Sequence, residues 1–280
     1  MGQGRLHLAT HRFAKPLRRM FVGWGGCALG AARYGARSIG RMATDLVFPP
    51  VCLACDRELP PQTPEEGLCC ECLAGFCYPR GTICPKCAAC LPPNGDRRIR
   101  CAYCRERRYK FAGSFALGTY AGVLRQVVLR TKKSAHESLA TAMGKYLGRR
   151  LLDVWGNRPV DAVVPVPMHW MRRLTRGVPA SELIAEGVAR QAGWPLFSDL
   201  VRSVRATRKQ GTLMPGERFR NVAGAFQLSP RYDIAGARVV LIDDVMTTGA
   251  TLDCIARILI RQGVGSVHAA VLARGVGSRS

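Results

Sequence analysis

The feature that most restricts the fold is the segment at residues 239–251, which reads VVLIDDVMTTGAT. Its first four residues are all branched and apolar, which is typical of a central parallel strand covered on both faces. Two carboxylates follow, and then small and hydroxyl-bearing residues that suit a tight loop opening a helix. The segment therefore indicates an open α/β sheet with both carboxylates at the carboxyl end of a strand, where such sheets bind ligands.

The side chains after this strand suit an anionic sugar. The carboxylates can accept hydrogen bonds from a ribose diol, while the threonine hydroxyls and the N–H groups at the helix start can hold a phosphate. The alternative is an Asx-turn and a helix cap without any ligand. No Gly-Lys-Ser/Thr follows, so ATP binding through a Walker loop is not indicated. The candidate ligand-binding residues are Asp243, Asp244, Thr247, Thr248, Gly249, Ala250 and Thr251.

Cysteine pairs form an internal repeat in the first half of the chain. Each of two units holds two C-x2-C pairs separated by 13 residues, and the second unit lies 32 positions after the first. Four thiolates suit one tetrahedral zinc, so two structural zinc ions are expected. The alternative is a disulfide framework, which would need an oxidising compartment. The candidate ligands are Cys52, Cys55, Cys69 and Cys72, and then Cys84, Cys87, Cys101 and Cys104.

The loop at residues 243–251 resembles the phosphoribosyl pyrophosphate loop of type I phosphoribosyltransferases, at both aspartates, both paired threonines, the glycine and the last threonine. A double zinc ribbon followed by such a domain resembles the ComF family of bacterial competence proteins, from about Phe48 to the end of the chain. Residues 161–176 (DAVVPVPMHWMRRLTR) are similar to that family's Pro-Val-Pro segment, and residues 218–226 (RFRNVAGAF) to its next element. The family usually continues Arg-Gly-Phe-Asn-Gln, whereas Val178, Pro179 and Ala180 follow Arg-Gly here, and this departure favours a binding role over catalysis.

Length and composition agree with this division. The 280 residues, 48% of them apolar, suffice for a doubly wound domain and a small zinc module. We expect an α/β fold with a type I phosphoribosyltransferase-like parallel sheet and helices on both faces over residues 111–280, a double zinc ribbon with four cysteines per zinc over residues 48–110, and a basic N-terminal arm over residues 1–47. Strands are expected at residues 161–166, 238–243 and 266–272, and helices at residues 120–129, 137–152, 181–191 and 251–262.

The charge indicates an acidic partner. The chain carries 42 Lys and Arg against 19 Asp and Glu, a formal net charge of +23. Residues 97–110 (RRIRCAYCRERRYK) interleave cations with rings, an arrangement that can bind single-stranded DNA, although a solvated basic face on a zinc hairpin is an equal alternative. Residues 1–47 are expected to form a basic arm or an amphipathic segment at a membrane surface. The candidate nucleic-acid residues are Arg97, Arg98, Arg100, Tyr103, Arg105, Arg107, Arg108 and Tyr109.

Two classes of function stay open. One is a binding protein that couples a phosphoribosyl pyrophosphate site to single-stranded DNA handling in natural transformation, with competence or recombination proteins as partners, as the ComF resemblance implies. The other is an active phosphoribosyltransferase with an unidentified acceptor. In both, Mg²⁺ would accompany the pyrophosphate. Both sites suit a cytoplasmic protein. Candidates to meet the pyrophosphate are Lys132, Arg172, Arg173 and Arg176.

Overall fold

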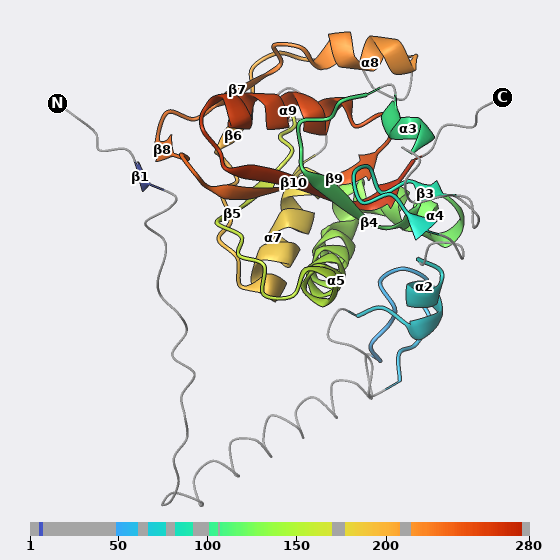
Figure 1. Ribbon diagram of the computed structural model, residues 1–280. Helices are drawn as coiled ribbons and strands as arrows, with labels where there is room; N and C mark the ends of the chain where they lie inside the picture. Colours follow the sequence, from blue (N-terminus) through green and yellow to red (C-terminus); the bar gives the residue numbers. More distant parts are fainter. Residues whose placement is uncertain are drawn as a thin grey trace, which may run out of the picture.

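The structure is a computed structural model (Figure 1), which describes residues 6–7, 49–60, 67–76, 82–91, 101–105, 107–169, 177–207 and 214–275. The predicted N-terminal arm lies outside these ranges, apart from Leu6–His7 (β1), which pairs in parallel with Tyr232–Asp233 (β8). Among the helices of the described ranges, none combines the length with the apolar character that a bilayer crossing requires.

A parallel sheet of four strands forms the centre of the fold. Its order is β4 (Gly113–Thr119), β10 (Ser266–Arg274), β9 (Arg238–Met246) and β5 (Ala162–Pro165). In Figure 1, α5 (Glu137–Trp155) and α7 (Ala180–Ala192) cover one face, and α9 (Ala250–Arg261) covers the other beneath α8 (Pro215–Val222). The predicted parallel α/β sheet with helices on both faces is confirmed.

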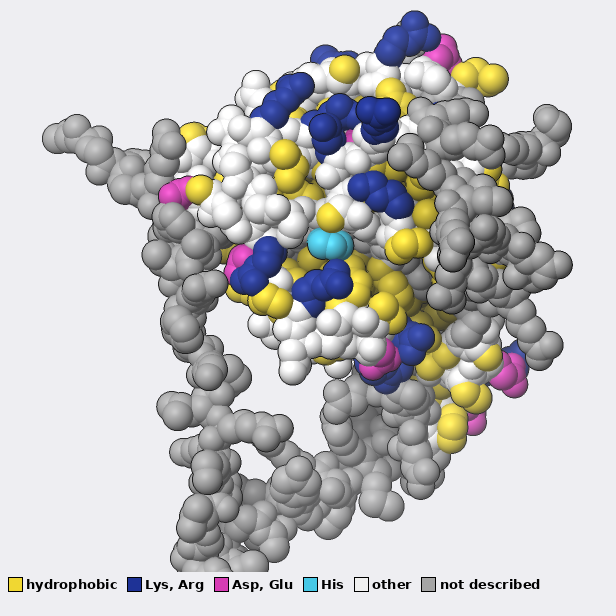
Figure 2. Space-filling model, viewed as in Figure 1, with side chains coloured by type: hydrophobic (Ala, Val, Ile, Leu, Met, Phe, Trp, Pro, Cys, Tyr) yellow, Lys and Arg dark blue, Asp and Glu magenta, His cyan; other side chains and the backbone are white. Residues whose placement is uncertain are grey.

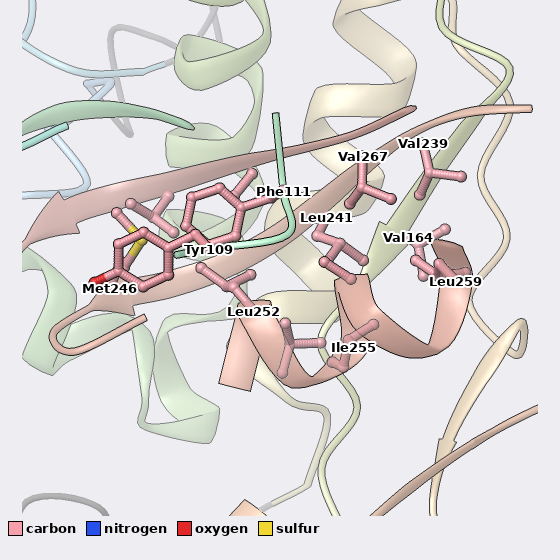
Figure 3. Packing of buried hydrophobic residues seen from close by; sticks show 14 of the residues in the cluster. Tyr109, Phe111, Val164, Val239, Leu241, Met246, Leu252, Ile255, Leu259 and Val267 are labelled. Carbon is pink, nitrogen blue, oxygen red and sulfur yellow. The ribbon is translucent and has the colours of Figure 1, made fainter. Parts of the chain in front are cut away.

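Alternation along β9 explains its continuous apolar run. Val239 and Leu241 face the cluster under α9, whereas Val240 and Ile242 face the cluster under α5 and α7. Because both faces are buried, every position of this run is apolar. Figure 3 shows Leu252, Ile255 and Leu259 of α9 packing toward this sheet, as their helical spacing predicts.

The helices match their predicted positions to within a few residues. α4 (Gly122–Thr131) begins two residues later than expected, and a 3₁₀ turn at Ser134–His136 (η2) leads into α5. The edge strand β4 was not predicted, because its glycines and small residues give a weak strand signal. A short antiparallel pair, β6 (Val201–Ser203) with β7 (Phe226–Leu228), extends the α9 side.

Helices α5 and α7 pack closely through glycines. A Cβ atom on Gly144 would lie 2.3 Å from the Ile184 carbonyl oxygen, and one on Gly187 would lie 2.4 Å from that of Thr141. Neither position has room for a side chain, so the two backbones approach directly.

Each cysteine unit folds as a knuckle followed by a helical turn. In the first unit, Val51 and Glu58 form an isolated antiparallel β-bridge, and α2 (Cys70–Ala74) follows. In the second unit, β2 (Thr82–Ile83) pairs with β3 (Cys90–Leu91), and α3 (Ala102–Arg105) follows. We call these the first and second metal modules (residues 49–76 and 82–105). The second cysteine pair of each unit lies at the start of its helix.

The two modules pack on opposite faces of the sheet at its β4 edge. Phe76 of the first module belongs to the apolar cluster under α5 and α7, and Ala89 of the second belongs to the cluster under α9. β4 is adapted to both, since a Cβ on Gly118 would lie 2.1 Å from the Phe76 carbonyl oxygen and one on Gly113 would lie 2.9 Å from that of Pro85. The modules therefore share the core of the sheet.

Candidate functional site

The predicted carboxylates lie near the carboxyl end of β9, which extends past them to Met246. One Oδ of Asp243 accepts a hydrogen bond from the Asp244 N–H at 2.9 Å. Lys132, which follows α4, forms an ion pair with Asp244, with 2.7 Å between Nζ and Oδ2. The structure thus brings together two residues that the sequence placed in separate roles, a ribose-binding carboxylate and a pyrophosphate-binding cation.

Burial and neighbouring charges shift the pKa values of Asp243 and Lys132. Removal from water raises the pKa of Asp243 to about 8, and the charge of Asp244 adds to this effect, while Lys132 opposes it. Burial alone would lower the pKa of Lys132, but the charges of Asp244 and Asp243 outweigh it and raise that pKa. At neutral pH the site therefore holds a protonated Asp243 beside an Asp244–Lys132 ion pair.

The loop at residues 247–250 turns sharply from β9 into α9. Gly249 adopts a left-handed conformation with φ of 74° and precedes α9 without a side-chain cap. The Thr248 hydroxyl accepts only a 3.4 Å hydrogen bond from the Ala250 N–H. The alternative of a side-chain helix cap is therefore not supported by the geometry.

A further cation reaches this loop from α8. Nη1 of Arg218 donates to the Thr247 hydroxyl oxygen at 2.9 Å. Sequence reasoning gave Arg218 no role, although it begins the segment 218–226 that resembles a family element. Together, Lys132 and Arg218 place positive charge beside the carboxylates and the threonine loop.

The other predicted pyrophosphate residues, Arg172, Arg173 and Arg176, lie outside the described residues. Beyond them, Pro179 precedes α7, its carbonyl accepts the Glu182 N–H at 3.0 Å, and it provides no side-chain cap. Its ring leaves no N–H for an anion.

Both cysteine clusters are assembled with the predicted pairing. In each unit the four sulfur atoms lie within 4.8 Å of one another. The S···S distances are 3.9 Å for Cys52 and Cys72, and 3.8 Å for Cys87 and Cys101. A tetrahedron with metal–sulfur bonds of about 2.3 Å has edges of about 3.8 Å. A disulfide would need about 2.05 Å, so the clusters fit metal sites and not the disulfide alternative.

The thiols of the first cluster differ in pKa. Burial alone would raise the pKa of Cys52, but backbone donors such as the Cys69 N–H, 3.3 Å from Cys52 Sγ, outweigh burial and lower this pKa to about 7. Burial and neighbouring thiols raise the pKa values of Cys55 and Cys72. A thiolate is the form that binds metal, so the backbone donors favour ligation at Cys52.

The predicted nucleic-acid residues divide into three groups. Arg97, Arg98 and Arg100 lie outside the described residues, as does the side chain of Arg105. The two tyrosines face inward: Tyr109 is only 6% exposed and stacks on Phe111, with 4.7 Å between ring centroids, and the guanidinium of Arg274 lies 5.7 Å from the centroid of the Tyr103 ring. The expectation that Tyr109 stacks on a base is wrong, because its ring belongs to the core.

The remaining two, Arg107 and Arg108, line a basic pocket. It has a volume of about 260 Å³, lies between residues 107–109 and helices α8 and α9, and also includes Phe219, Asp253 and Arg257. Arg107 lies over the Phe219 ring at 4.6 Å from the centroid, and its buried Nη1 has no hydrogen-bond partner among the described residues. Figure 2 shows further Lys and Arg side chains dispersed over one face of the molecule.

Known proteins resemble this chain in both halves. The phosphoribosyl transferase domain model matches residues 174–279. The DNA utilization protein YhgH of Salmonella typhi is 28% identical over 232 residues, which cover 82% of this chain and 99% of that protein. Competence protein F of Haemophilus influenzae is 26% identical over 197 residues (67% of this chain, 78% of that protein), and competence protein ComFC of Bacillus subtilis is 25% identical over 228 residues (76% and 90%).

An alignment over 82% of the chain is too long to fit within the sheet domain alone, and so it includes the metal modules as well. The paired cysteine clusters and the carboxylate–threonine loop of this structure occur in one chain, as in the resemblance noted from the sequence. Together, these likenesses support a protein of the ComF family.

Proposed function

We propose that this protein binds phosphoribosyl pyrophosphate, or a related sugar phosphate, and handles single-stranded DNA during DNA uptake in the cytoplasm. The observation that carries the first part is the carboxylate pair beside the threonine loop and Lys132 at the carboxyl end of the sheet. Relatives named as competence and DNA utilization proteins support the second part.

Each group has a role in this proposal. Asp243 and Asp244 accept hydrogen bonds from the ribose hydroxyls, and the loop from Thr247 to Thr251 holds the 5′-phosphate. Lys132 is 41% exposed, so it can leave Asp244 and meet the pyrophosphate, whose remaining charge Mg²⁺ neutralises. Zinc in both cysteine clusters stabilises the modules, which suits a reducing compartment.

A calorimetric titration with phosphoribosyl pyrophosphate and Mg²⁺ tests the sugar-phosphate site. The double variant Asp243→Asn and Asp244→Asn should abolish binding without unfolding the protein, because the carboxylates lie at a strand end. Asp153→Asn is the matched control, since Asp153 is an exposed carboxylate on α5 that pairs with Arg150, away from the site. Unchanged affinity in the folded double variant would make the motif a structural turn.

The alternative is an active phosphoribosyltransferase. In that case the protein would release pyrophosphate when an acceptor is present, whereas a binding protein would hold the intact ligand. Pyrophosphate release above that of the double variant, across candidate acceptors, would favour the enzyme.

For the nucleic acid we propose that the basic pocket at Arg107, Arg108 and Arg257 takes a phosphate of the strand. The unpartnered Nη1 of Arg107 supports an anion there, because a buried charged donor without a partner is costly. Further phosphate contacts are assigned in this proposal to Arg97, Arg98, Arg100 and Arg105, whose side chains lie outside the described part of the structure.

Fluorescence anisotropy with single-stranded DNA at several salt concentrations tests the pocket. Replacing Arg107 and Arg108 by Gln should lower the slope of log affinity against log salt by about 1.4, that is, about 0.7 for each lost phosphate contact. The double replacement of Arg149 and Arg150 on α5 removes the same net charge elsewhere and should leave the slope nearly unchanged. An equal change of slope in both double variants would show that the slope depends on net charge alone and not on the pocket.

A further inference from the structure

Arg274 is an unusual buried cation at the end of β10. It is 3% exposed, and among the described residues its guanidinium meets backbone carbonyls and no carboxylate. Its Nε donates to the Cys87 carbonyl at 2.8 Å, and Nη1 donates to the Met246 carbonyl at 2.8 Å and also to the carbonyls of Thr247 and Gly275. One side chain therefore ties the second metal module to the start of the candidate phosphate loop.

Tyr109 contacts the same loop, at Thr248 and Gly249. Its hydroxyl donates to the Thr248 carbonyl at 2.9 Å. A Cβ on Gly249 would lie 3.0 Å from Cε1 of Tyr109, so the loop rests directly on the ring. Figure 3 shows the Tyr109 ring beside Phe111 and Met246 within the core.

These contacts fix which way the peptide groups of the loop point. In a planar trans peptide the C=O of one residue and the N–H of the next point in opposite directions. Since the Thr247 carbonyl faces Arg274 and the Thr248 carbonyl faces Tyr109, the N–H groups of Thr248 and Gly249 point away from the core. Among the described residues these two N–H groups have no partner.

We propose that Arg274 and Tyr109 are positioning residues that hold the loop with its N–H groups directed at the ligand's phosphate monoester, and that the second metal module is thereby a structural part of this site. The inference rests on the proposed sugar-phosphate function. It assigns to the loop the 5′-phosphate end of the ligand, while Lys132 and the carboxylates meet the rest. The charge of Arg274, shared among carbonyls, adds positive potential behind the loop.

Calorimetry on the full-length, metal-containing protein tests this inference with three probes: ribose 5-phosphate, phosphoribosyl pyrophosphate with Mg²⁺, and pyrophosphate with Mg²⁺. Tyr109→Phe removes a single hydroxyl from the core and should weaken ribose 5-phosphate and phosphoribosyl pyrophosphate by about fivefold, the worth of one neutral hydrogen bond. Arg274→Lys keeps the charge but loses the planar fork, and should weaken both by at least about tenfold. Pyrophosphate should bind both variants within about twofold of wild type, since it uses another part of the site.

Arg238→Lys is the matched control. The Arg238 guanidinium also makes hydrogen bonds, to both carboxylate oxygens of Asp161, but it does so at the other end of β9. It should leave all three affinities unchanged. Nuclear magnetic resonance gives a direct readout, because ribose 5-phosphate should shift the amide signals of Thr248 and Gly249 in wild type and shift them less in Tyr109→Phe.

The outcomes separate the two proposals. Wild-type affinity for ribose 5-phosphate in folded Tyr109→Phe and Arg274→Lys would overturn this inference and leave the sugar-phosphate proposal standing. Equal loss of all three probes would also overturn it, because it would indicate general loosening. Wild-type protein that binds none of the probes would overturn the sugar-phosphate proposal itself and this inference with it.

Discussion

The protonation of Asp243 predicts how ligand binding depends on pH. The pKa of this carboxyl is raised from 3.8 to about 8, first by its removal from water and then by the charge of Asp244. Ribose hydroxyls and Mg²⁺ both favour the carboxylate, so binding must expel the proton. Affinity for phosphoribosyl pyrophosphate should therefore rise as pH rises through 8 and then level off.

The size of the effect follows from the pKa. With a pKa of about 8, roughly one Asp243 in eleven is ionised at pH 7 and roughly ten in eleven at pH 9. Affinity should thus increase about tenfold between pH 7 and pH 9, and binding at pH 7 should release about 0.9 proton. The unfolded chain ionises Asp243 near pH 3.8, so the unliganded protein should also lose stability from about pH 4 to 8, by up to about 1.4 kcal/mol per pH unit.

Calorimetry at pH 7 to 9 in two buffers of different ionisation enthalpy measures both the affinity and the proton release. Ligand phosphate groups titrate near pH 6, below this window. Arg238→Lys keeps Asp243 and should retain the pH dependence. Affinity that stays flat or falls between pH 7 and 9, with the same enthalpy in both buffers, would refute the reasoning.

Three further predictions follow from the packing. Elemental analysis should find two zinc ions per chain, and one zinc, or a native disulfide at Cys84, would contradict the two-site assignment. In calorimetry, Cys104→Ser should weaken binding of ribose 5-phosphate more than binding of pyrophosphate, because the second module is bonded to the phosphate loop through Arg274. Cys55→Ser should do the reverse, because Arg130, two residues before Lys132, donates to the Ala54 carbonyl of the first module at 2.6 Å. Equal losses of both ligands in the two variants would show that the modules act alike. Gly187→Ala should cost about 1–3 kcal/mol of stability in thermal unfolding, whereas Gly216→Ala, with open space around it, should cost nothing; equal melting temperatures would show that α5 and α7 can separate.

Periodicity and motif chemistry predicted the sheet strands β5, β9 and β10 and the helices that cover them, because these elements obey local rules. The four residues before Asp243 are all apolar, and Leu252, Ile255 and Leu259 repeat at helical spacing. β4 was not predicted, because its sequence has no clear strand pattern and its glycines are explained by the close approach of the Phe76 and Pro85 carbonyls. Only tertiary structure shows such approaches.

The cysteine spacing predicted both clusters correctly, but not where the modules lie. Their sequence is a compact block, which suggested a small zinc ribbon separate from the sheet domain. In the structure Cys87 lies in the same cluster as Leu252, so the second module is part of the core. Arg274 was hidden for the same reason, because its partners in the second module and the loop lie far away in the sequence and are backbone atoms.

The hydrogen bond between Arg274 and Cys87 joins residues that are 187 positions apart, which affects the order in which parts of the protein can fold during synthesis. At about 5–20 residues per second, Arg274 leaves the ribosome roughly 10–40 s after Cys87. During this interval the cysteines of the second module have no sheet to pack against, although all four are already synthesised and can capture a metal. Zinc shortage is therefore expected to reduce the yield of newly made protein before it strips metal from finished molecules.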